Sequence, residues 1–208
     1  ADLPKDSGRF DLPIALGILA ASGQIDGSRL HLYEFAGELS LSGALRPVRG
    51  ALVMGLALYK QTNAPHLVLP PGSAEEAALV PGATVYRAKH LRDVAHQFLP
   101  AGTASAATPT QWARLLAPVH LQPTTCATDL DLADVKGQTG AKRALEIAAA
   151  GGHSLLMVGP PGSGKSMLAH RFAGLLPALS VDEALETASV ASLSGRFQMA
   201  HWLKRPTR

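Results

Sequence analysis

The chain has 208 residues, 47% hydrophobic and 17% charged, so it can bury a globular core and can form one large domain or two small ones. Its net charge of +3 neither requires nor excludes a polyanionic partner, because nucleic-acid binding depends on how the charges cluster. The single cysteine, Cys126, excludes an internal disulfide and suits a reducing compartment.

The first hundred residues alternate predicted helices and strands. A helix is expected over residues 11–22, with Asp11 as its N-cap and Pro13 in its first turn. Two short strands are expected within residues 35–46, around a turn at Ser42-Gly43. The remaining expected elements are helices over residues 50–60, 74–80 and 91–99, and strands over 66–70 and 83–87. This alternation predicts an α/β domain over residues 1–99.

We expect no secretion signal in the first residues of this sequence, because no basic segment precedes an apolar core there. The apolar run from Leu12 to Ala21 is far shorter than the roughly 20 residues that a membrane span needs. We therefore expect a cytoplasmic protein with no membrane contact. Because the chain starts at Ala1 rather than Met, we also expect it to be a fragment of a longer protein.

Composition changes after residue 99. Residues 100–128 are rich in Ala, Thr, Pro and Ser and are expected to form a linker, in which Trp112 and Leu115-Leu116 dock on a neighbouring surface. A second domain is expected over residues 129–208. Its first helix is predicted over residues 136–150, since small and apolar side chains recur on one face there.

A phosphate-binding motif follows that helix. Gly159-Pro-Pro-Gly-Ser-Gly-Lys-Ser166 fits G-x-x-x-x-G-K-[ST], between an expected strand over residues 153–158 and an expected helix over 167–176. Glycines let backbone N–H groups curl around phosphates. Lys165 is expected to bind the β- and γ-phosphates of ATP, and Ser166 to ligate Mg²⁺ through its hydroxyl. The predicted loop ligands are Gly159, Pro160, Pro161, Gly162, Ser163, Gly164, Lys165 and Ser166.

Several segments together carry a family resemblance. Residues 134–138, 141–153 and 159–166 resemble the start of a magnesium-chelatase-like AAA+ module. Residues 10–16 and 37–50 resemble the Lon-protease-like domain, of the ribosomal S5 domain 2 type, that precedes this module in the YifB/ComM family. Residues 195–197 and 202–206 resemble the segment after the phosphate loop in that family.

The resemblance implies a function for the intact protein. Members are bacterial AAA+ ATPases that assemble as hexameric rings and include a DNA helicase that promotes branch migration during natural transformation. It also places Val135, Gly137 and Gln138 at the adenine edge of the nucleotide pocket. Val135 is expected to pack on the base, and Gly137 to turn the chain.

Hydrolysis of ATP in this class needs a second, acidic motif at the end of an apolar strand. After Ser166 the acidic residues are Asp182, Glu183 and Glu186, which lie in a stretch of helical character, residues 181–189. We interpret them as a solvated helix face. The resemblance places the remaining catalytic groups outside this sequence, so this chain alone is expected to bind ATP without turning it over.

The Lon-like resemblance raises the possibility of peptidase activity, which needs a serine activated by a lysine. Matching the helix starts puts Arg9 at the nucleophile position, with Ser7 nearby, and puts Leu52 where the lysine belongs. The first lysine of that helix is Lys60, so we expect no proteolysis.

Two groups of basic residues are candidates for DNA contact. One is Arg46 and Arg49 beside the hairpin, with Lys60. The other is a basic segment with Phe197 and Trp202, which contains Arg196, His201, Lys204, Arg205 and Arg208. The alternatives to a DNA motor are a metal-insertion ATPase of the magnesium-chelatase type, an ATP-dependent Lon-like protease, and a repair ATPase whose Lon-like domain follows the ATPase core. The order of domains here argues against the first and the last.

Overall fold

The computed structural model describes residues 8–61, 63–100, 111–116, 130–177, 179–203 and 205. The chain divides into two compact units, the first made of residues 1–120 and 187–199, and the second of residues 121–186 and 200–208. Strands and helices build the first unit, and helices build the described part of the second. The mixed α/β class expected from the sequence is therefore confirmed.

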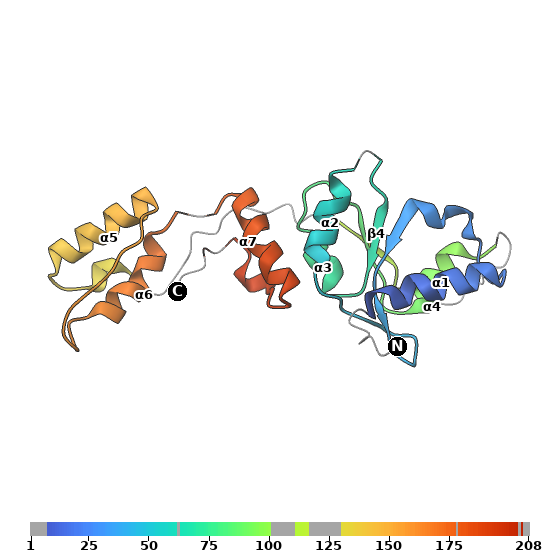
Figure 1. The fold of residues 1–208 in the computed structure, drawn as a ribbon, viewed down its shortest axis with the longest axis horizontal. Coiled ribbons are helices and arrows are strands. Elements are labelled where there is room, and N and C mark those ends of the chain that lie inside the picture. Colours follow the sequence, from blue (N-terminus) through green and yellow to red (C-terminus); the bar gives the residue numbers. More distant parts are fainter. Residues whose placement is uncertain are drawn as a thin grey trace, which may run out of the picture. The chain divides into compact units, whose positions relative to one another are not determined.

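A four-stranded sheet organises the first unit (Figure 1). Its order is β1-β4-β5-β6, with bounds Tyr33–Phe35, His66–Leu69, Val85–Arg87 and Ala113–Leu115. The pairs β1/β4 and β4/β5 are parallel, whereas β5 and β6 are antiparallel. Parallel neighbours need long crossover connections, and helices α2 (Ala51–Tyr59) and α3 (Ser73–Ala77) lie in these two connections.

Strand β4 is buried on both faces, as a covered parallel strand must be. Leu67 and Leu69 pack with α2 and α3, whereas Val68 packs on the opposite face with α1 (Asp11–Ala21) and α4 (Leu91–Ala95). Successive side chains of a strand point to opposite faces, so this one strand serves two cores. Figure 1 shows α2 and α3 on one side of β4 and α1 and α4 on the other.

Gly55 lets α2 and α3 approach closely. A Cβ at this buried position would stand 3.3 Å from the carbonyl oxygen of Ala77 and 3.3 Å from Cγ2 of Val80. The buried hydroxyl of Ser73 fixes α3 further, because Ser73 Oγ accepts a hydrogen bond from Val48 N and donates one to Val48 O. Close packing and paired polar groups therefore hold this face of the sheet.

Strand β6 corrects the prediction of a linker throughout residues 100–128. Ala113–Leu115 pairs with β5, and Trp112 stacks on Tyr86 with ring centroids 4.9 Å apart. A strand of three residues is too short to show an alternating pattern, so the Ala-, Thr- and Pro-rich composition of this stretch led to the prediction of a linker. The expected docking of Trp112 is confirmed, whereas Leu116 is 77% exposed.

The predicted hairpin is present but shorter than expected. β2 (Glu38–Leu39) pairs antiparallel with β3 (Leu45–Arg46), and the turn between them contains Gly43 at a φ of 83°. Phe35, which the prediction placed in the hairpin, belongs to β1 instead. β1 escaped prediction because its partner β4 follows only after the hairpin and α2.

The second unit packs α5 (Thr139–Gly151) and α6 (Lys165–Leu175) with the short 3₁₀ helix η4 (Leu132–Asp134). Its core joins four side chains: Leu132, Val135, Leu145 and Leu168. The helix expected from residue 136 begins at Thr139, because Gly137 and Gln138 have left-handed φ values of 67° and 53°. In the part of the chain that the structure describes, no helix is long and apolar enough to cross a membrane.

Residues 153–158, expected as the strand before the glycine loop, form no strand. Met157 packs partly on the core of the second unit, but Leu156 and Val158 are each 87% exposed. A strand needs a neighbour that pairs with its backbone N–H and C=O groups, and the described residues of this unit contain no other strand. The prediction was wrong because an apolar run does not form a strand without a sheet to join.

Candidate functional site

The glycine-rich loop runs directly into α6. Gly162 and Gly164 have left-handed φ values of 82° and 81°, and Lys165 is the first helical residue. Leu168 N donates to Gly164 O at 3.0 Å, which closes the first turn. The N–H groups of a first helical turn have no partner inside the helix and lie at the positive end of its dipole. This position therefore suits an anion.

Lys165 folds back onto the loop. Its Nζ donates to Gly159 O at 2.9 Å, to Pro160 O at 2.8 Å and to Ser163 Oγ at 3.2 Å. A lysine ammonium has three protons to donate, and the loop provides an acceptor for each of them. The positive charge is thus held at the mouth of the loop, beside the open N–H groups of α6.

The predicted loop residues are brought together in this one turn. Gly164 and Lys165 are half-buried, and the other six loop residues are exposed. Ser166 lies in the first turn of α6, next to Lys165. Among the described residues, no cluster of three or more His, Cys, Asp or Glu side chains is arranged to hold a metal ion. The Mg²⁺ ligation predicted for Ser166 through a nucleotide remains a prediction.

The segment predicted to line the adenine pocket meets the loop through one side chain. A Cβ at Gly164 would lie 3.1 Å from Nε2 of Gln138, so this amide touches the end of the loop. Gly137 turns the chain just before it. Val135, however, is 3% exposed within the core of the second unit. In this structure Val135 packs in the core with Leu132, Leu145 and Leu168, so its side chain has no exposed face on which a base could lie.

Arg171 is a residue of this region that the sequence analysis missed. Its Nε donates to Asp131 O at 2.9 Å, and its Nη2 lies 3.8 Å from Asp134 Oδ2, while the side chain is only 14% exposed. Arg171 thereby ties η4 to α6, the helix that begins with Lys165. A single arginine, beside His170 in a helix that is otherwise mostly apolar after Ser166, was the available signal.

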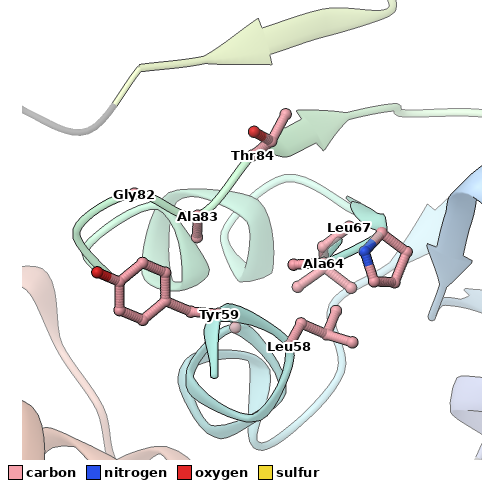
Figure 2. A pocket seen from close by; sticks show the side chains of 9 residues that line it. Leu58, Tyr59, Ala64, Leu67, Gly82, Ala83 and Thr84 are labelled. Atoms are coloured by element: carbon pink, nitrogen blue, oxygen red, sulfur yellow. The ribbon is translucent and has the colours of Figure 1, made fainter. Parts of the chain in front are cut away.

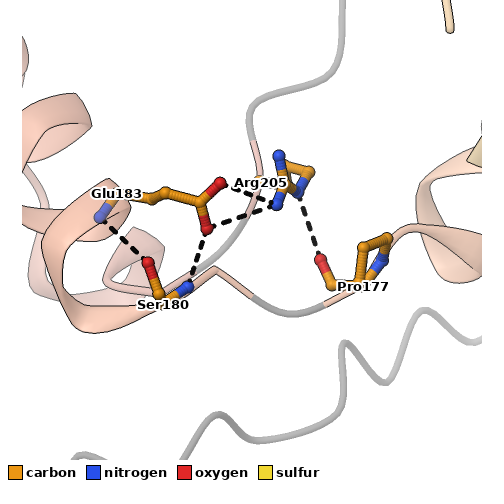
Figure 3. A network of polar contacts seen from close by, with 4 residues as sticks. All are labelled: Pro177, Ser180, Glu183 and Arg205. Atoms are coloured by element: carbon orange, nitrogen blue, oxygen red, sulfur yellow. Dashed lines mark hydrogen bonds and ion pairs between the residues drawn. The ribbon is translucent and has the colours of Figure 1, made fainter. Parts of the chain in front are cut away.

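Of the acidic residues after the loop, Glu183 caps the N-terminus of a helix. Ser180 N donates to Glu183 Oε2 at 2.9 Å, and Glu183 N donates to Ser180 Oγ at 3.2 Å, a reciprocal cap of α7 (Val181–Leu193). The bonds with Ser180, and then the charge of Arg205, lower the pKa of Glu183 (Figure 3). The expectation that Asp182, Glu183 and Glu186 lie on a helix is confirmed.

Two members of the predicted basic and aromatic segment have structural roles. Arg205 donates from Nε to Pro177 O at 3.1 Å and from Nη2 to both carboxylate oxygens of Glu183 (Figure 3). Trp202 packs on a small core of the second unit that contains Leu179 and Ala184. Both side chains thus make contacts within the second unit. Lys204 and Arg208 lie outside the described residues.

The first unit lacks a lysine where the Lon-like resemblance requires one. Leu52 is fully buried at that place in α2, and Lys60 follows the far end of the helix, about 12 Å along the axis. Arg9, at the nucleophile position, holds its guanidinium 4.8 Å from the ring centroid of Phe10. Ser7 lies outside the described residues.

The basic residues near the hairpin do not form one patch with Lys60. Arg46 pairs with Glu38 across the hairpin at 3.5 Å, with both side chains exposed. Arg49 lies beside Gly195, where Nε stands 3.1 Å from the position of a Cβ. Arg49 precedes α2 and Lys60 follows it, so the helix separates them.

Comparison with known proteins covers both units. A family model described as "Magnesium chelatase, subunit ChlI" matches residues 131–208, and one described as "Subunit ChlI of Mg-chelatase" matches residues 1–73. Competence protein ComM of Haemophilus influenzae is 48% identical over 209 residues, covering 100% of this chain and 40% of the relative. Uncharacterized proteins YifB of Salmonella typhimurium and Escherichia coli are 44% and 43% identical, again over 100% of this chain and 39% of each relative.

The chain therefore spans about two fifths of the length of these relatives. Each of these three matches covers the whole of this chain, both units included. The chain belongs to the YifB/ComM family of magnesium-chelatase-like proteins.

Proposed function

We propose that this chain carries the nucleotide-binding site of an ATP-driven motor. In this proposal residues 129–208 are the start of an AAA+ module, and residues 1–99 form a Lon-protease-like domain without peptidase activity. The observation that carries the proposal is the ammonium group of Lys165, held by Gly159 O, Pro160 O and Ser163 Oγ at the start of α6. The buried Leu52 supports the second part, since the serine of a Lon-type site would lack its base.

The residues present fit ATP and Mg²⁺. The loop combines two left-handed glycines, the N-terminal turn of a helix and a primary ammonium group, which together match a chain of phosphates. The backbone from Gly159 to Gly164 would cradle the phosphates, Lys165 would hold the β- and γ-oxygens, and Ser166 would offer its hydroxyl to Mg²⁺. The metal ion would neutralise phosphate charge when bound.

Gln138 would border the nucleotide site on the side of Gly164. Its amide can both donate and accept, and its left-handed backbone fixes its direction next to the loop. Arg171 would act as a positioning residue, since its bonds to Asp131 O and Asp134 hold this segment against α6.

We propose DNA as the substrate of the motor in the intact protein, which would work as a hexameric ring in the cytoplasm. The family resemblance implies a helicase that promotes branch migration, and one relative is named a competence protein. The alternative is metal insertion, which the description of the family models favours. The two differ in what stimulates hydrolysis: branched DNA in one case and a porphyrin in the other.

The test measures ATP hydrolysis by the full-length parent alone, with a DNA four-way junction, and with protoporphyrin and Mg²⁺. We expect stimulation by the junction and loss of all hydrolysis in the Lys165→Ala variant. Arg143→Ala is a matched control, because Arg143 lies on the exposed face of α5 and pairs only with Glu146 in the described structure. Hydrolysis that ignores DNA and responds to protoporphyrin would overturn the DNA assignment and leave the nucleotide site intact.

A direct measurement on this chain separates binding from turnover. We expect a fluorescent ATP analogue to bind in the presence of Mg²⁺, with affinity at least tenfold lower in Lys165→Ala, as loss of one charged hydrogen-bonding group implies. Equal affinity in the variant and the parent chain would refute the assignment of the loop.

A further inference from the structure

An apolar groove opens in the first unit at the edge of the sheet. Its volume is about 330 Å³, and it lies between η1 (Gly8–Phe10), α2, β1 and β4. Phe10, Met54 and Leu58 are among the apolar side chains that line it. A second cavity, between Tyr59 and Thr84, has only about 80 Å³ and suits water molecules (Figure 2). The larger groove has room for a bulky apolar side chain.

The groove lies at an open strand edge. β1 is the terminal strand of the sheet, with β4 as its neighbour. Ala36 N donates to Val68 O, so the N–H and C=O groups of Ala36 point towards β4. These groups alternate in direction along a strand, so those of Glu34 also point towards β4, whereas those of Phe35 point away from it, towards the outer edge. Outward-facing N–H and C=O groups of an edge strand are a template for pairing with another extended chain.

Charges of both signs border the groove. Arg9 and Glu34 line it from different elements, and both side chains are exposed. Among the described residues, neither forms an ion pair. The guanidinium of Arg9 lies over the ring of Phe10, which holds the positive charge beside an apolar wall. An occupant that carries an acidic and a basic group can satisfy both.

Apolar surface continues from the groove along α1. Phe10, Ile14 and Ile18 recur every four residues and are 51%, 60% and 63% exposed. Side chains at this spacing lie on one face of a helix. Gly17, beside Ile18, has no side chain, and nothing lies within 4 Å of the position that a Cβ would take there. Phe10 therefore lines the groove and also begins an exposed apolar stripe on α1.

We propose that this groove binds an extended peptide segment of a protein partner. The segment would pair its backbone with the outer edge of β1 and place one large apolar side chain between Phe10 and Leu58. Flanking acidic and basic residues of the segment would meet Arg9 and Glu34. A polypeptide is the one class of ligand that offers a repeating N–H and C=O edge together with apolar and charged side chains, as in strand-addition recognition. This site is separate from the glycine loop and does not depend on the proposed nucleotide binding.

The test uses the complete 208-residue chain and fluorescein-labelled heptapeptides. The probe alternates valines around a central leucine, with one aspartate and one lysine near its ends. One control peptide has glycine at the centre, and a second has the same side chains but N-methylated backbone amides. We expect polarisation titration to show at least tenfold weaker binding for both controls, because the first lacks the apolar anchor and the second lacks donors for β1.

Variants of the chain locate the site. Ala57 lines the groove and is exposed, so Ala57→Trp should fill it without disturbing the core and should weaken probe binding at least tenfold. Ala150→Trp, at an exposed alanine of α5, is the matched control and should leave binding unchanged. Arg9→Ala should weaken binding several-fold, whereas Arg92→Ala, at an exposed arginine of α4, should not.

Each outcome decides for or against the proposal. Unchanged melting temperatures for the variants, together with lost binding in Ala57→Trp, would support it. Equal binding of the N-methylated peptide, or no binding of the leucine probe at all, would overturn it. Concentration-dependent self-association of the chain that Ala57→Trp abolishes would also overturn it, since the occupant would then be a second copy.

Discussion

Replacing Trp112 tests whether β6 is an integral part of the first unit. Trp112 is half-buried, stacks on Tyr86 and lies with its ring centroid 6.1 Å from that of Tyr33. Complete burial of a large aromatic side chain makes truncation to alanine cost about 3–5 kcal/mol. Half of that, with about 1 kcal/mol for the aromatic pairs, gives an expected loss of about 3 kcal/mol for Trp112→Ala. For a unit of this size, we expect a melting temperature lower by roughly 10 °C.

Urea unfolding followed by circular dichroism measures this loss. Leu116→Ala is the control, because Leu116 directly follows β6 and is 77% exposed, so its truncation should cost at most about 0.5 kcal/mol. If Trp112→Ala and Leu116→Ala destabilise the chain equally, the pairing of β6 contributes nothing and the linker interpretation of residues 100–128 is restored.

Three further predictions concern backbone and charge. Gly17→Ala should stabilise the chain by about 0.5–1 kcal/mol in thermal unfolding, because its position is open, whereas Gly55→Ala should lose this gain to the close contact with α3. Burial raises the pKa of Glu75, but the hydrogen bonds from Arg87 and from backbone N–H groups outweigh it, so the pKa is lowered. The charged carboxylate therefore stabilises the fold above the unfolded pKa of about 4.3, and this stability is lost as the pH falls through the lower pKa of the folded state. Glu75→Gln should lower the free energy of unfolding at pH 7, and the difference between variant and parent chain in urea unfolding should shrink towards pH 3. Gly164→Ala should strain the left-handed loop by about 1–2 kcal/mol and weaken nucleotide binding; unchanged affinity would contradict the role of this glycine.

Local signals in the sequence were sufficient for most helices. Asp11 and Pro13 marked the start of α1, and the spacing of small and apolar residues marked α5. The prediction of Asp11 as the N-cap was wrong, because Phe10 is the N-cap and the Asp11 carboxylate accepts a hydrogen bond from Leu39 N instead. Even there, the left-handed pair Gly137 and Gln138 delayed the start of α5, a detail that periodicity does not contain. Helix-forming information is local, whereas the exact boundary depends on backbone conformation at one or two residues.

Strands were harder because a strand exists only with its neighbours. β1 and β6 were missed since their partners lie far away in the sequence. The opposite error occurred at residues 153–158, where an apolar run has no sheet to join among the described residues. For the candidate site, the motif predicted the residues of the loop, but only the three-dimensional arrangement revealed the buried state of Val135 and the position of Arg171.

The self-bonding of Lys165 bears on the thermodynamics of the proposed nucleotide binding. Phosphate oxygens that engage its ammonium group replace three acceptors of the loop rather than water. The number of hydrogen bonds made by Nζ then stays nearly constant, so the gain in free energy comes mainly from charge attraction. Such an exchange should make affinity fall steeply with ionic strength. Before any ligand arrives, the three bonds of Lys165 already tie the two ends of the loop together.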